Sequence, residues 1–85
     1  MLIQNVKAKI VNVQPLHATA KNASHRIGYV GEIVTLDVDT NMTFKRQDNE
    51  GNDSYTRTSK VDEILIRENW IGVETKNHRY LMERL

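Results

Sequence analysis

Basic and aromatic side chains gather in one stretch of the chain, between residues 44 and 60. The basic residues are Lys45, Arg46, Arg57 and Lys60, and the aromatic residues are Phe44 and Tyr55. Small β-barrels bind single-stranded nucleic acids by stacking bases on aromatic side chains beside a cationic groove. The four basic residues, with Tyr55 or Tyr29 as the stacking aromatic, therefore define a candidate nucleic-acid surface.

Two features of the same stretch argue against that surface. The acidic residues Asp48, Glu50 and Asp53 lie in its centre, where they would repel a phosphate backbone. Lys45 and Arg46 are adjacent, and adjacent side chains of an unbulged strand point to opposite faces of a sheet. A solvated face of mixed charge is therefore the favoured interpretation, and nucleic-acid binding is the alternative.

Patterns typical of catalysis or metal binding are poorly represented. His17 and His25 precede Asp37 and Asp39, but their spacing fits no recognised metal site, and no nucleophile or phosphate-binding motif is found. The chain has no cysteine, which excludes disulfides, thiol nucleophiles and thiolate ligands. We therefore predict no catalytic residues, no cofactor, no metal site and a protein that is not an enzyme.

The single tryptophan, Trp70, has two interpretations. It follows the polar pair Glu68-Asn69, which is typical of a turn. A tryptophan at such a position packs into the core or stays exposed as an anchor for a partner. The sequence leaves both open.

Length and composition indicate one small soluble domain, spanning residues 1–85. Of the 85 residues, 39% are hydrophobic and 27% are charged, which is ordinary for a globular chain. The formal net charge of +1 excludes strong global attraction to phosphate. Charged residues interrupt the apolar residues at the N-terminus, and no apolar run is long enough for a membrane-spanning helix. We expect no membrane association.

Alternating apolar residues predict strands along most of the chain. The alternation is clear at residues 6–10, 34–38, 42–46 and 71–75, and it places Val34, Leu36 and Val38 in the core, with Met42 and Phe44 also inward. Val11 and Val13 continue the first strand on the opposite parity, which suggests a bulge or an end buried on both faces. Residues 16–25 are predicted to form a surface loop, with a short helical turn over residues 18–23 as the alternative.

Turn residues separate these strands. Gly28 and Gly31 suit a tight turn in which the backbone needs positive φ or close approach. Residues 48–53 predict the tip of a hairpin, and residues 76–79 predict a reversal in which Asn77 is able to take a left-handed conformation. Five to six short antiparallel strands without an amphipathic helix indicate a small all-β barrel.

Two segments resemble known families. Arg26-Ile-Gly28-Tyr-Val-Gly31-Glu-Ile33-Val resembles the opening of Src-homology-3-like barrels, including the KOW type. Arg57-Thr58-Ser59-Lys60-Val61, followed by Val73-Glu-Thr75-Lys-Asn77-His-Arg-Tyr80, resembles small phage and prophage proteins. Lys60 and His78 depart from the second pattern, at positions expected to be exposed turns.

These resemblances imply a Src-homology-3-like barrel of phage or prophage origin, in the cytoplasm of a bacterial host. They imply no catalytic residues. We therefore expect a non-catalytic binding module that acts on a protein partner, with host-directed or anti-defence inhibition as one form. The alternative is a nucleic-acid-binding barrel that uses the 42–58 hairpin. The candidate binding residues are Lys45, Arg46, Tyr55, Arg57, Lys60 and Trp70.

Overall fold

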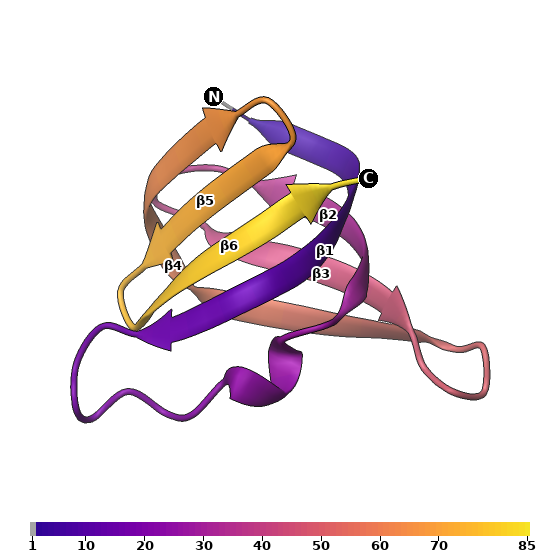
Figure 1. The fold of residues 1–85 in the computed structure, drawn as a ribbon, viewed down its shortest axis with the longest axis horizontal. Coiled ribbons are helices and arrows are strands. Elements are labelled where there is room, and N and C mark those ends of the chain that lie inside the picture. Colours follow the sequence, from indigo (N-terminus) through magenta and orange to yellow (C-terminus); the bar gives the residue numbers. More distant parts are fainter. Residues whose placement is uncertain (1) are drawn as a thin grey trace.

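Six strands follow one another and close into a barrel in the computed structural model, which describes residues 2–85 (Figure 1). The strands are β1 (Ile3–Pro15), β2 (Val30–Leu36), β3 (Asn41–Gln47), β4 (Asp53–Arg67), β5 (Trp70–Thr75) and β6 (His78–Arg84). Each strand pairs antiparallel with the next, and β6 returns to pair with β1. Within residues 2–85 the helical content is one 3-10 turn, η1 (Ser24–Arg26). The prediction of a small all-β barrel with five to six antiparallel strands is confirmed.

β1 closes the barrel because it is long enough to pair with two strands. Residues 3–9 pair with β2, and residues 8–15 pair with β6. The register against β6 shifts between Ile10 and Asn12, which places a bulge at Val11. The bulge suggested by the change of apolar parity is therefore present, and Pro15 ends the strand as predicted.

β4 joins what the sequence presents as separate short strands. It runs without interruption for 15 residues, and pairs first with β3 and then with β5. Its register shifts between Arg57 and Lys60, and again between Val61 and Glu63. Each shift changes which side chains face inward, so the period-two pattern breaks although the strand continues.

The core is filled by apolar side chains from all six strands. They are Ala8, Ile10, Val13, Ile33, Leu36, Met42, Phe44, Val61, Ile71, Val73, Tyr80 and Met82, with Ala23 from the loop between β1 and β2. The predicted inward positions of Met42 and Phe44 are confirmed, since both are fully buried. Burial of this set at one centre gives the barrel its hydrophobic stabilisation.

The predicted core face of β2 is partly wrong. Leu36 is fully buried, but Val34 is half-buried and Val38, beyond the end of the strand, is 42% exposed. The register of β2 against β3 shifts between Ile33 and Thr35. This irregularity turns Ile33 inward in place of Val34, so strict alternation fails there.

The two glycines before and within β2 have the roles that the sequence predicts. Gly28 has φ +95°, which is a left-handed conformation that favours glycine. Gly31 lies against the backbone of β3, where a Cβ atom would overlap the carbonyl oxygen of Lys45. One glycine therefore allows the turn, and the other allows the close approach of two strands.

The β1–β2 loop (residues 16–29) passes one end of the barrel and is held there by side chains (Figure 1). It is a loop as predicted, and its helical turn lies at Ser24–Arg26 rather than at residues 18–23. The His78 Nε2 donates to the Lys21 carbonyl at 2.6 Å, and the His17 Nε2 bonds the Asn77 Oδ1 at 3.0 Å. Contacts from β6 and the β5–β6 turn therefore position the loop.

Two local expectations for the C-terminal half are wrong. His78 is 8% exposed rather than part of an exposed turn, because it begins β6 and contacts the loop. Lys60 is exposed but lies within β4 rather than in a turn. The predicted reversal is present, and Asn77 makes it without positive φ. Thr75 Oγ1 accepts hydrogen bonds from the backbone N–H groups of residues 77 and 78 in this turn. In residues 2–85 there is no helix of the length and apolarity needed to cross a membrane.

Candidate functional site

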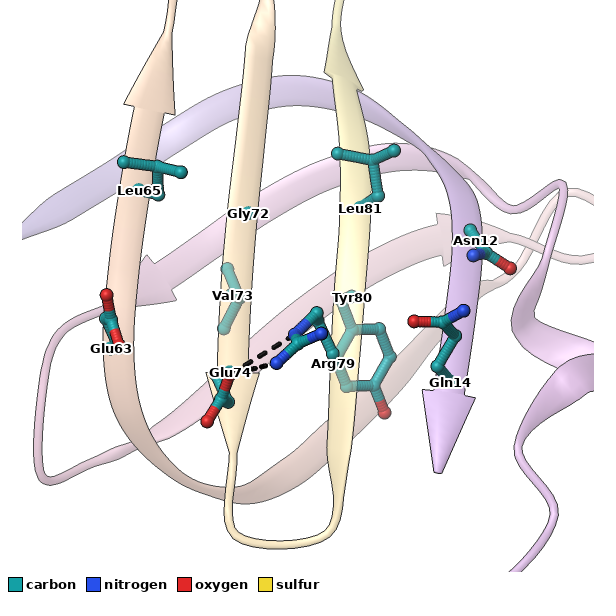
Figure 2. Close-up of a pocket in the computed structure, with 10 residues that line it drawn as sticks. All are labelled: Asn12, Gln14, Glu63, Leu65, Gly72, Val73, Glu74, Arg79, Tyr80 and Leu81. Atoms are coloured by element: carbon teal, nitrogen blue, oxygen red, sulfur yellow. Dashed lines mark hydrogen bonds and ion pairs between the residues drawn. The ribbon is translucent and has the colours of Figure 1, made fainter. Parts of the chain in front are cut away.

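A shallow groove crosses the outer face of β4, β5, β6 and β1, with a volume of about 450 Å³ (Figure 2). Leu65, Gly72 and Leu81 form one row across the three strands β4, β5 and β6, with Asn12 of β1 at its end. Because Gly72 carries no side chain, the row is hollow between the two leucines. We call this surface the Gly72 groove.

The leucines beside Gly72 are exposed on a face that the sequence did not single out. Leu65 is 51% exposed and Leu81 is 39% exposed. A signal for one of them exists in the run Ile64-Leu65-Ile66, because a half-buried strand with three consecutive apolar residues must turn at least one outward. No pattern in the sequence identifies Leu81, because its position follows from the register of β6.

Trp70 lies beside the groove, on the same side of β5 as Gly72, although it is not among the residues that line the groove. It lies two residues before Gly72, on the outward side of β5, and is 40% exposed. The core interpretation of Trp70 is therefore wrong, and the exposed position matches the interface interpretation. Its cross-strand neighbours are Arg67 on β4 and Glu83 on β6. Tryptophan is enriched among the residues that dominate binding at protein interfaces, and the buried core of an interface is more apolar than its rim.

A row of charged residues borders the groove next to the apolar row. Glu63 of β4 and Glu74 of β5 are directly opposite each other, which is unfavourable for two like charges. Arg79 of β6 donates to Glu74 Oε2 from Nη2 at 2.9 Å and from Nε at 3.2 Å (Figure 2). Two carboxylates and one guanidinium leave one negative charge, so this end of the groove favours a cation.

The predicted basic residues of the hairpin do not form one patch. Lys45 lies opposite Tyr55 on the outer face, and Arg57 is paired with Thr43 on the same face. Arg46 is two residues after Phe44, so its side chain leaves β3 on the same side as that of Phe44. Its guanidinium lies 4.0 Å from the centre of the Tyr29 ring. As the period of the strand predicts, only Lys45 shares a face with Arg57. Tyr55 is the most exposed aromatic side chain in the described part of the chain, at 60%.

Acidic residues accompany these cations. Lys45 and Arg46 line a hollow of about 450 Å³ at the base of the hairpin, together with Lys7, Glu32 and Asp53. Lys60, which is also exposed, lies beyond the register shift in β4 and is separated from that hollow. The hairpin therefore presents mixed charge rather than a continuous basic track.

Polar residues of the two segments with the phage-type resemblance lie together where β4 meets the β5–β6 turn. Thr58 Oγ1 accepts from the Met42 N–H and donates to the Ser59 carbonyl. Asn77 Nδ2 donates to Ser59 Oγ at 2.6 Å, which connects the β5–β6 turn to β4. Thr75 closes the same turn through the backbone of His78. These polar residues therefore stabilise the fold at the point where the two segments meet.

The histidines are engaged in loop contacts. His17 bonds Thr19 and Asn77, and His25 lies edge-on to the Tyr29 ring at 6.4 Å. Among residues 2–85, no three His, Asp or Glu side chains are grouped so that they could hold a metal ion.

Comparison of the chain with protein-family models, curated proteins and solved structures finds no match in any of the three.

Proposed function

We propose that this protein is a non-catalytic binding module that docks a protein partner on the Gly72 groove. The observation that carries the proposal is the cluster of Leu65, Leu81 and Trp70, three large apolar side chains exposed around a position without a side chain. Exposed apolar surface costs free energy that a partner recovers by covering it. The hollow over Gly72 is suited to receive one apolar side chain of that partner.

The charge of the groove narrows the chemistry of the partner. Arg79 neutralises Glu74, and the described residues provide no cation for Glu63. An extended segment with an apolar residue followed by Lys or Arg would fill the hollow and place its cation near Glu63. Opposite charges at an interface favour the correct register and faster association.

The resemblance of residues 57–61 and 73–80 supports a phage or prophage origin, and the resemblance of residues 26–34 supports a Src-homology-3-like barrel. With that origin, the partner is a protein in the cytoplasm of the bacterial host, and inhibition of a host or defence protein is one form of the activity. The nucleic-acid alternative has weaker support, because the hairpin cations are divided between two faces and accompanied by acidic residues.

The test compares partner binding by matched surface variants. A protein captured from bacterial lysate is purified, and its affinity is measured for the wild type and for Trp70→Ala, Leu81→Lys and Val30→Lys. Val30 is 55% exposed on β2 and lies outside the groove, so Val30→Lys controls for the added charge.

We expect Trp70→Ala and Leu81→Lys to weaken binding by about thirtyfold or more, and Val30→Lys to bind like the wild type. Glu63→Gln should weaken binding by no more than about fivefold, since exposed ion pairs contribute little. Equal affinity of the wild type and both groove variants would contradict the proposal.

A further inference from the structure

The β1–β2 loop and the strands beside it line a third hollow, of about 500 Å³. The loop contributes Lys21, His25 and Arg26, β4 contributes Arg57, and β6 contributes His78. We call this the loop hollow. It lies apart from the Gly72 groove, since no residue lines both.

The charge of the loop hollow is of one sign. Lys21, Arg26 and Arg57 are its formally charged lining residues, and no Asp or Glu lines it. The chain as a whole has 12 basic and 11 acidic residues, so three cations without an anion are a local segregation of charge. The ion pairs among residues 2–85 are Lys76 with Asp62 and Arg79 with Glu74, which leaves these three cations without a carboxylate.

Contacts within the protein hold part of this cationic set in place. Arg26 is half-buried, and its Nη1 donates to the Tyr80 hydroxyl at 2.6 Å. The Lys21 carbonyl accepts from the ring of His78 at 2.6 Å, which fixes the backbone of the loop at that residue. These contacts order the loop before a ligand binds, so the protein loses less conformational entropy on binding.

We propose that the loop hollow binds a small anion with two or more linked phosphates. Guanidinium groups present paired donors that match phosphate oxygens. Arg57 provides one such group, and Arg26 provides the N–H donors that its bond to Tyr80 does not use. Three cations balance the roughly three negative charges of a diphosphate near neutral pH. The cations surround one hollow rather than follow a track, so the arrangement fits a compact ligand better than a nucleic-acid strand.

Inorganic pyrophosphate is the probe, and isothermal titration calorimetry at low ionic strength is the measurement. Arg57→Gln removes one exposed cation from the loop hollow. Arg67→Gln is the matched control, because Arg67 is an exposed arginine on the same strand that does not line the hollow. We expect saturable binding by the wild type, about tenfold weaker binding by Arg57→Gln, and unchanged binding by Arg67→Gln.

Amide chemical shifts locate the bound probe. Pyrophosphate should shift resonances of residues 19–26 and 57–59, and leave those of Gly72 and Leu81 unchanged. A dissociation constant weaker than about 1 mM, or equal weakening by Arg57→Gln and Arg67→Gln, would overturn the proposal.

Two further arms separate this site from the other surfaces. Leu81→Lys should bind pyrophosphate at least as well as the wild type even if it loses the protein partner, so the two proposals fail independently. A 5′-phosphorylated oligonucleotide should bind more weakly than pyrophosphate. Tighter oligonucleotide binding that is lost in Arg57→Gln would assign the hollow to a nucleic acid and overturn the small-ligand proposal.

Discussion

Gly31 of β2 lies directly against the backbone carbonyl of Lys45 in β3, in a space that a Cβ atom would occupy. The atoms that block a larger residue belong to the backbone of β3, so they cannot move without breaking hydrogen bonds between β2 and β3. We expect Gly31→Ala to lower the free energy of unfolding by about 3 kcal/mol, which urea denaturation measures.

Gly72→Ala is the matched control for that variant. A Cβ atom at position 72 would meet Leu65 at an ordinary contact distance of 3.7 Å. Alanine is less costly to order in a strand than glycine, so we expect equal stability or a gain of up to about 1 kcal/mol. A similar loss in both variants would show that the close approach at Gly31 is not the cause.

Leu36→Ala tests the corrected core face of β2. Leu36 is fully buried, so its truncation should cost about 2–5 kcal/mol of unfolding free energy. Val38→Ala should cost less than about 1 kcal/mol, because Val38 is 42% exposed. The comparison of the two denaturation midpoints decides the assignment, and an unchanged midpoint for Leu36→Ala would refute it.

The hydrogen bond from His78 to the Lys21 carbonyl should protect the β1–β2 loop from proteolysis. His78→Ala removes this bond and a buried ring, so we expect a loss of about 1–3 kcal/mol and faster tryptic cleavage after Lys21. His17→Ala removes only exposed contacts and should have a smaller effect on both. Unchanged cleavage of His78→Ala would show that other contacts hold the loop.

Oligonucleotide binding should be no tighter than about 10 μM at physiological salt, which is within the non-specific range. The reason is that Lys45 and Arg46 point to opposite faces of β3, so at most one of them can contact a phosphate together with Arg57. Fluorescence anisotropy with a labelled single strand measures this affinity. A sub-micromolar dissociation constant, abolished by replacing Arg57 and Lys60 with Glu, would favour the nucleic-acid alternative.

Local pattern in the sequence predicted the class of fold and several of its details. Alternation predicted the strands and the inward positions of Met42 and Phe44, because one face of each strand must be buried. The roles of Gly28 before β2 and Gly31 within it, and the bulge at Val11, were also predicted correctly. Each of these features depends on neighbours within a few residues, so the sequence alone contains the information.

Only the tertiary structure decided which distant residues share a surface. Trp70, Leu65 and Leu81 form one apolar cluster because β4, β5 and β6 pair in a particular register. Arg57 joins Lys21 and Arg26 because the β1–β2 loop passes that end of the barrel. Bulges in β2 and β4 change which side chains face the core, at positions where strict alternation predicts no change. Register, bulges and loop position depend on pairing energies summed over the whole barrel, so no short segment specifies them.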